Sequence, residues 1–168
     1  MKISGRNLRR RLQLLGDRLS RAKYYHGHGV HSPFVYGLVR KVFMRRRLME
    51  GTGTTLYDEL CAMGMARRSA RQLHNTLYYL EGKSYSINDV CCDLSILLAD
   101  YPTEGLRAAY QDAEMEGVTL VICQPYANRE RQSLVNELVE MHHSTSVDNR
   151  AYLLLFFDKK LPKQHYRL

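Results

Sequence analysis

The stretch DLSILLADYPTEGLRAAYQDAEMEGVTLVICQPYANRERQSLVNELVE, residues 93–140, decides the fold class. Within it, residues 94–101 and 118–126 are apolar enough to form strands that are buried on both faces. Residues 103–116 and 127–141 follow these strands in turn and have the apolar spacing of helices. Strand, helix, strand and helix in series predict an α/β sheet.

The flanking sequence extends this sheet on both sides. Residues 144–147 and 151–157, separated by a turn at Asp148 and Asn149, predict an antiparallel hairpin at the carboxyl-terminal side. Residues 84–90 have the composition of a further strand, and residues 56–63 and 69–80 that of helices. We expect about five strands in all.

The first fifty residues differ in composition from the rest. Four leucines spaced by three or four positions predict a helix over residues 7–23, after which Gly27 and Gly29 interrupt the pattern. Ser32 and Pro33 are typical of the cap and first position of a second helix, which we expect to end in the basic run Arg45 to Arg47. We therefore predict two regions: a helical extension, residues 1–50, with its helices joined at HGHGVHSPF, and an α/β domain, residues 51–168.

Charge is distributed unevenly between these regions. The whole chain carries a net charge of +8, but residues 1–50 contain 13 lysines and arginines against Asp17 and Glu50, a net +11, which leaves −3 for residues 51–168. A basic segment such as residues 1–50 can contact nucleic-acid phosphates, and Tyr24 and Tyr25 are available to stack on bases. The alternative is a solvated face, or pairing with the acidic domain. The candidate phosphate contacts are Arg9, Arg10, Arg11, Arg18, Lys41, Arg45, Arg46 and Arg47.

The cysteines and histidines do not have the spacing of a metal site. Cys61, Cys91, Cys92 and Cys123 form no CxxC pair, and we expect them to be buried free thiols in a cytoplasmic protein. His26, His28 and His31 lack a carboxylate or thiol nearby, which favours a structural joint between helices over a metal centre or a phosphate contact. His142 and His143 end the helix over residues 127–141, where a positive charge would meet the negative end of the helix dipole. The longest apolar run, residues 152–157, is too short to span a membrane.

Several of these segments in order resemble one protein family. HGVHSPFVYGLVRKVF (residues 28–43), SARQLHNTLYYL (69–80), the stretch 93–140 and the closing segment 144–168 are similar to bacterial class I S-adenosylmethionine-dependent methyltransferases that carry a basic helical extension. The resemblance implies a Rossmann-like sheet. In it, residues 84–90 and 94–101 correspond to the family's first and fourth strands, which are parallel neighbours.

The chain departs from this family where the cofactor would bind. The family has a glycine-rich turn after its first strand, whereas no glycine occurs here between Gly82 and Gly105, and Val90 in the turn resists a positive φ. The family's second and third strands have no counterpart, so the predicted sheet is a reduced one. Only three residues separate Val90 from Leu94, too few for an ordinary parallel crossover, so we expect residues 84–90 to form an antiparallel edge or no strand.

Four polar residues remain as cofactor-binding candidates. Asn88 and Asp89 lie in the altered turn, Gln124 follows the strand over 118–126, and Asp100 ends the strand over 94–101, where capping the helix that begins at Thr103 is its alternative role. No acid stands beside Gln124 to bind a cation or to take a proton, so we expect no catalytic residue and no metal.

The sequence therefore supports three hypotheses. The first is a methyltransferase-like protein that has lost cofactor binding and catalysis and serves as a scaffold or interaction module. The second is an S-adenosylmethionine-dependent methyltransferase whose reduced site is completed by another subunit, paired through an exposed sheet edge. The third is nucleic-acid binding through the basic segment.

Overall fold

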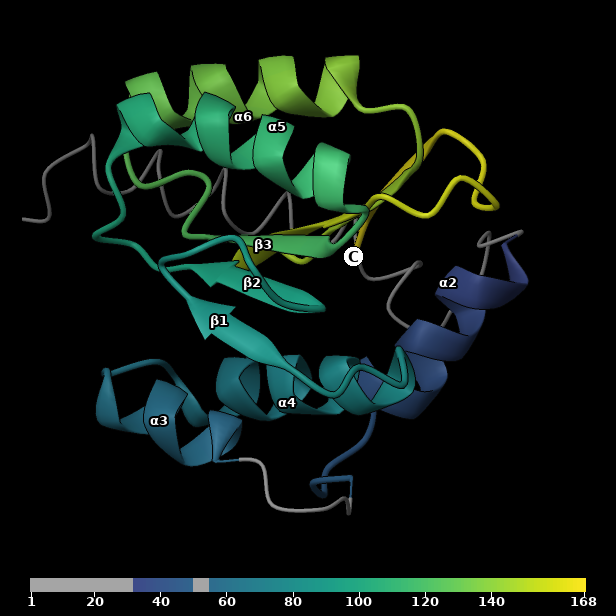
Figure 1. Cartoon of the computed structure of the whole chain (residues 1–168). Coiled ribbons are helices and arrows are strands. Elements are labelled where there is room, and N and C mark those ends of the chain that lie inside the picture. Colours follow the sequence, from purple (N-terminus) through teal and green to yellow (C-terminus); the bar gives the residue numbers. More distant parts are fainter. Residues whose placement is uncertain (1–31, 50–54) are drawn as a thin grey trace, which may run out of the picture.

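The computed structural model describes residues 32–49 and 55–168, and these form an α/β structure around one mixed sheet (Figure 1). The strand order is β1-β2-β3-β5-β4-β6, and β5 runs opposite to the other five. The strands are β1 (Tyr85–Ile87), β2 (Leu94–Leu97), β3 (Thr119–Cys123), β4 (Thr145–Asp148), β5 (Tyr152–Phe156) and β6 (Gln164–Arg167). The predicted α/β class and the hairpin β4–β5 are confirmed, with six strands in place of about five.

Helices cover both faces of the sheet. The helical elements are α2 (Pro33–Leu38), the π-helical turn η1 (Val39–Phe43), α3 (Leu56–Ala62), α4 (Arg67–Tyr79), the 3₁₀ turn η2 (Thr103–Gly105), α5 (Leu106–Glu116) and α6 (Arg129–Met141). Figure 1 shows α5 and α6 on one face, with α2, α3 and α4 on the other. None of the helices in the described part is long and apolar enough to cross a membrane.

Alternate side chains of the central strands supply the two cores. Ile96, Val121 and Leu154 pack toward α4, while Leu120 and Leu153 pack toward α5 and α6. Every residue of β2 is buried, and so are the last four of β3, as the apolar composition of the 94–101 and 118–126 runs predicts. Every residue of β5 is buried as well.

The prediction that the first two strands cannot be parallel neighbours is wrong. Tyr85 pairs with Leu94 and Ile87 with Ile96 in a parallel ladder. Because β1 has only three residues, the chain has to return about 7 Å, which the six residues 88–93 span easily without a crossover helix.

Asp93 and Asn88 hold this short return in place. The Asp93 carboxylate accepts hydrogen bonds from the backbone N–H groups of Lys83 (2.8 Å) and Ser84 (3.0 Å) and from the Ser84 hydroxyl (2.9 Å). These bonds, the one from the Lys83 N–H first, lower the pKa of Asp93. The left-handed position of the turn is Asn88, with φ 58°, and not Val90. Asparagine tolerates this conformation better than a branched residue does, so the turn forms without glycine.

The segment before α3 packs into the same core as the α/β region. Ser32 caps α2, accepting from the N–H of Val35 at 3.4 Å, and Pro33 is its first residue, as predicted. Val35 and Val42 are fully buried in a core cluster with Leu73 of α4. The helix does not continue to Arg45–Arg47 but ends at Phe43.

Polar side chains of α4 bind the backbone that follows this end. The Asn75 side chain accepts from the N–H of Met49 (2.8 Å) and donates to the carbonyl of Arg47 (3.1 Å), and His74 Nε2 lies 3.1 Å from the Met49 carbonyl oxygen. Gln72 donates to the Phe43 carbonyl at 3.2 Å. These polar side chains are buried because each satisfies a backbone group of residues 43–49.

His142, at the carboxyl-terminal end of α6, is buried, which contradicts a charged role at the helix dipole. Its Nε2 lies 3.2 and 3.1 Å from the carbonyl oxygens of Thr145 and Phe156 and so carries the proton, while Nδ1 accepts from the Tyr110 hydroxyl at 3.2 Å. Burial lowers the pKa of His142, although the two carbonyls act in the opposite direction. The ring is therefore a neutral structural link between α5, α6 and the hairpin.

This lowered pKa predicts a specific loss of stability in acid. Below about pH 6.5, the usual histidine pKa, the unfolded chain binds a proton that the folded chain resists, so the contribution of His142 decreases as the pH falls toward its folded pKa. At pH 7.5 we expect His142→Asn to lower the free energy of unfolding by about 2 kcal/mol. The difference from wild type should shrink toward pH 5 in urea titrations, whereas His143→Asn, at an exposed position, should show no such trend. A pH-independent difference would contradict this account.

Candidate functional site

The four predicted cofactor-binding residues lie at one edge of the sheet. Asn88 and Asp89 follow β1, Asp100 lies three residues after β2, and Gln124 follows β3 directly. Because β1, β2 and β3 are parallel, these positions share the carboxyl-terminal edge, where ligands bind in open α/β sheets. The structure thus brings the candidates to the location that the fold class favours.

Two of these side chains bind the protein itself. Asn88 accepts from the backbone N–H of Leu98 at 2.8 Å and donates to the Asp100 carboxylate at 3.4 Å. The N-cap residue of η2 is Pro102, and no side chain caps this turn. The predicted capping role of Asp100 is therefore wrong. Asn88 therefore ties the end of β1 to the loop after β2.

The other two candidates are used within their own turns. Asp89 accepts from the N–H of the adjacent Val90 at 2.8 Å. Gln124 has φ 46°, and its backbone N–H donates to the Ala151 carbonyl at 2.8 Å while its own carbonyl accepts from Ala127 at 3.1 Å. A residue with a side chain at this positive φ occupies the space beside the backbone that a glycine would leave open.

Arg131 of α6 is the central residue of this edge, and the sequence analysis missed it. Its guanidinium donates to the carbonyls of Tyr101 (2.8 Å), Leu98 (3.1 Å) and Cys123 (3.2 Å), and only 2% of the residue is exposed. The signal was its spacing: Arg131 lies four and seven positions before Val135 and Leu138, so it is on the buried face of α6. Burial lowers its pKa, opposed by Cys123 and by Asp100.

Arg131 and Asn88 together satisfy the polar groups that a ligand would meet at the ends of β2 and β3. The three carbonyls point at the guanidinium, and the N–H of Leu98 points at the Asn88 side chain. Cys123, at the end of β3, is buried, and burial raises the pKa of its thiol to about 12. It is therefore a neutral packing residue and not a nucleophile.

The remaining cysteines and histidines give no metal centre within the described ranges. No cluster of three or more histidine, cysteine or acidic side chains suited to a metal occurs in residues 32–49 and 55–168. His26, His28 and His31 lie outside these ranges. The prediction that all four cysteines are buried holds only for Cys123: Cys61 and Cys92 are half-buried, and Cys91 is exposed in the loop between β1 and β2.

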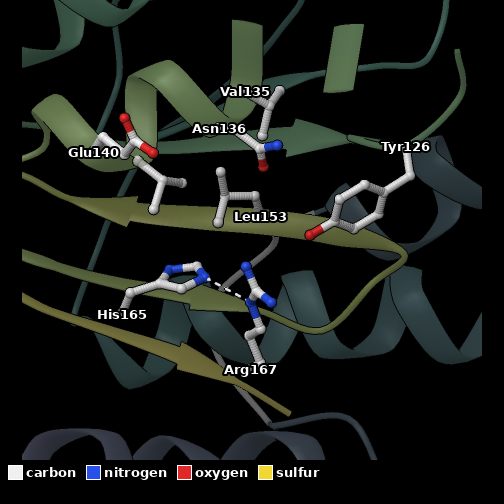
Figure 2. Close-up of a pocket in the computed structure, with 8 residues that line it drawn as sticks. Tyr126, Val135, Asn136, Glu140, Leu153, His165 and Arg167 are labelled. Carbon is white, nitrogen blue, oxygen red and sulfur yellow. Dashed lines mark hydrogen bonds between the residues drawn. The ribbon is translucent and has the colours of Figure 1, made fainter. Parts of the chain in front are cut away.

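A small cavity lies between α6 and strands β5 and β6 (Figure 2). Its volume is about 200 Å³, and Figure 2 shows Val135 and Asn136 of α6 on one side with His165 and Arg167 on the other. The lining residues are Tyr126, Val135, Asn136, Val139, Glu140, Leu153, His165 and Arg167. It contains none of the four predicted residues, and pockets for drug-sized ligands have roughly 300–1,000 Å³.

Three polar side chains of this cavity, those of Tyr126, His165 and Arg167, are paired within the protein. The Tyr126 hydroxyl donates to the buried Asp148 at 2.6 Å. Arg167 Nε donates to His165 Nε2 at 3.4 Å, which leaves the proton of that ring on Nδ1, 2.8 Å from the Ser146 hydroxyl. The pairs link the loop before α6 to β4, and β4 to β6, and they have no nucleophile–base–acid order.

The predicted phosphate-binding residues form an exposed group where they are described. Lys41, Arg45, Arg46 and Arg47 are all solvent-exposed around the end of η1, and Lys41 Nζ lies 6.0 Å from the centre of the Tyr79 ring. No ion pair of these four with an acidic residue is recorded among the described residues. Arg9, Arg10, Arg11 and Arg18 lie outside the described ranges.

Comparison with known proteins adds no relative: no family model, no curated protein and no solved structure matches the chain. Inferences about function rest on the residues and contacts above.

Proposed function

We propose that this chain is a methyltransferase-like α/β domain that does not bind S-adenosylmethionine and acts as a scaffold or interaction module. The resemblance of residues 93–140 and 144–168 to the class I family supports the first part. So does the parallel pairing of β1 with β2, the arrangement that the resemblance implies for the family's first and fourth strands.

One observation supports the proposed loss of cofactor binding. Arg131 donates hydrogen bonds to the carbonyls of Leu98, Tyr101 and Cys123 at the ends of β2 and β3. A ligand at this edge would have to displace a buried guanidinium from three carbonyl groups, one buried and two part-buried. An abandoned acceptor costs about 1–3 kcal/mol when it is fully buried, and less where water can reach it. The ligand would have to recover this energy before gaining any affinity.

The turn after β1 adds a second obstacle. Cofactor binding at this position needs close approach of the backbone, which glycines permit. Here the residue with positive φ is Asn88, and its side chain spans to Leu98 and Asp100 across the same edge. The space over the turn is therefore occupied by the Asn88 side chain, which is held there by its two hydrogen bonds.

Isothermal titration calorimetry of the full chain with S-adenosylmethionine and S-adenosylhomocysteine tests this proposal. We expect no saturable binding below about 1 mM for either ligand, which corresponds to less than about 4 kcal/mol of binding free energy. Micromolar binding would overturn the proposal and favour the enzyme hypothesis. Light scattering during the same titration distinguishes a site completed by a second subunit, because binding would then depend on a dimer.

The interaction role is supported by the two edges of the described sheet. β1 and β6 each pair on one side only within the described residues. Such edges present backbone N–H and C=O groups to which another strand can be added. A partner or a second copy recruited in this way would need neither a cofactor nor a catalytic residue.

Nucleic-acid binding is a second candidate, favoured by the exposed group Lys41, Arg45, Arg46 and Arg47. Phosphate contacts release counterions, so the logarithm of the binding constant should fall by about 0.9 per contact for each tenfold increase in salt. We expect Arg45→Gln/Arg46→Gln/Arg47→Gln to reduce the slope for duplex DNA by about two to three. Fluorescence anisotropy at several salt concentrations measures it. An unchanged slope would remove these residues from the interface, and Arg129→Gln on α6 is the matched control.

A further inference from the structure

The loop between β1 and β2 carries two adjacent thiols on an ordered backbone. Cys91 is exposed, Cys92 is half-buried, and their Sγ atoms lie 3.5 Å apart. The backbone around them is held by three side chains: Ser86 donates to the Asp89 carbonyl (2.8 Å), Ser95 donates to the Cys92 carbonyl (3.1 Å), and Asp93 accepts from Lys83 and Ser84. Both thiols are thus presented together on the loop that returns to the start of β2.

This spacing does not favour a direct bond between the two sulfurs. A disulfide needs about 2.05 Å between the sulfurs and usually at least 4.4 Å between the Cα atoms, whereas consecutive Cα atoms are about 3.8 Å apart. The observed 3.5 Å instead fits one atom bound to both sulfurs. With bonds of about 2.3 Å, the angle at that atom would be roughly 100°, close to that of a pyramidal three-coordinate centre.

The number of protein ligands limits which kind of atom could be bound to both sulfurs. The described residues offer no cluster of three metal-binding side chains, so the loop supplies two thiols and no third protein ligand. Structural zinc sites use four protein ligands and catalytic ones three. A trivalent arsenic atom that carries one organic substituent needs only two thiolates, because its substituent fills the third position.

We propose that Cys91 and Cys92 form a dithiol site that chelates a monosubstituted trivalent organoarsenical. Two As–S bonds form as the As=O group and both S–H bonds break, and the oxygen leaves with the two protons as one molecule of water. Arsenic stays trivalent and both sulfurs keep their oxidation state, so no oxidant or reductant takes part. The ring that closes is one atom larger than a disulfide ring, which removes the strain of the direct bond.

The other cysteines provide internal controls. Cys123 is buried with its pKa raised to about 12, and Cys61 lies on α3 as a half-buried single thiol. The Cys91 pKa is also raised, first by its hydrogen bond with Cys92. Because the step releases water and no net proton, binding should not strengthen as the pH increases. The site does not depend on the proposed function, since neither thiol takes part in the bonds of Arg131.

Titration of the reduced full chain with phenylarsine oxide tests the proposal. We expect one adduct per chain by intact mass, the loss of two titratable thiols, and release by an excess of a small dithiol but not of a monothiol. Cys91→Ser and Cys92→Ser should each weaken binding at least 100-fold, and Cys61→Ser should leave it unchanged. An adduct that survives in both single variants, or that is lost in Cys61→Ser, would overturn the assignment. So would Zn²⁺ binding at lower concentration than the arsenical with the same two cysteines required.

Discussion

We expect Arg131→Met to lower the free energy of unfolding by about 3 kcal/mol. Methionine keeps the apolar stem, but the carbonyls of Leu98, Tyr101 and Cys123 lose the guanidinium donor. The bond to Cys123 is buried, whereas the other two are part-buried and the Leu98 carbonyl also accepts from the N–H of Tyr101. Each such carbonyl costs about 1–3 kcal/mol, reduced where water can enter. Arg131→Lys should lose about 2 kcal/mol, because one ammonium group cannot reach three acceptors in the geometry of a guanidinium.

Urea unfolding followed by circular dichroism measures this difference. Arg129→Met is the matched control, since Arg129 begins the same helix but is exposed. We expect it to stay within about 0.5 kcal/mol of wild type. A loss of less than 1 kcal/mol for Arg131→Met would mean that the guanidinium does not hold the ends of β2 and β3 together.

Asn75→Ala should have the second largest effect on stability and lower the free energy of unfolding by about 2 kcal/mol. The Asn75 side chain is fully buried and satisfies both the N–H of Met49 and the carbonyl of Arg47. Alanine leaves both backbone groups without their partner and leaves a small void beside them. The basic segment around Arg45 to Arg47 should then detach from α4.

Limited trypsin digestion measures this detachment directly. In Asn75→Ala we expect cleavage after Arg45, Arg46 or Arg47 to accelerate at least tenfold. The digestion is carried out without denaturant, at a pH where the chain remains folded. Asn136→Ala, on the exposed face of α6, should leave the cleavage rate unchanged. Equal cleavage rates in all three proteins would show that Asn75 does not anchor the segment.

Local sequence patterns predicted most of the elements. The apolar runs at residues 94–101 and 118–126 became β2 and β3, and Ser32 with Pro33 marked the start of α2 because capping is a property of a few consecutive residues. The hairpin β4–β5 followed from a turn between two apolar runs. These signals all lie within one element or between neighbours in the chain.

The failures involved partners distant in the sequence. Arg131 was not among the predicted residues, because its role depends on carbonyls that lie up to 33 residues earlier. Asn75 is in a helix whose polar face proved to be buried against residues 43–49. The parallel pairing of β1 and β2 was missed because the minimum crossover length assumes strands longer than the three residues of β1.

The position of the four candidate residues in the sheet could be predicted from the sequence, but their hydrogen bonds could not. Asn88, Asp89, Asp100 and Gln124 do lie at the carboxyl-terminal edge, because position at the end of a predicted strand is readable from the sequence. The hydrogen bonds that these four residues form could not be predicted from the sequence. Asn88 replaces glycine at a positive φ and ties two loops together, and neither fact follows from its neighbours in the chain.

Backbone amide NMR of the full chain with added S-adenosylhomocysteine tests the central claim most directly, because the amides of Asn88, Leu98 and Gln124 report on the edge that Arg131 and Asn88 occupy. We predict that their chemical shifts stay unchanged up to millimolar ligand. Saturable shifts confined to these amides would show that a nucleoside ligand enters this edge and would contradict the account.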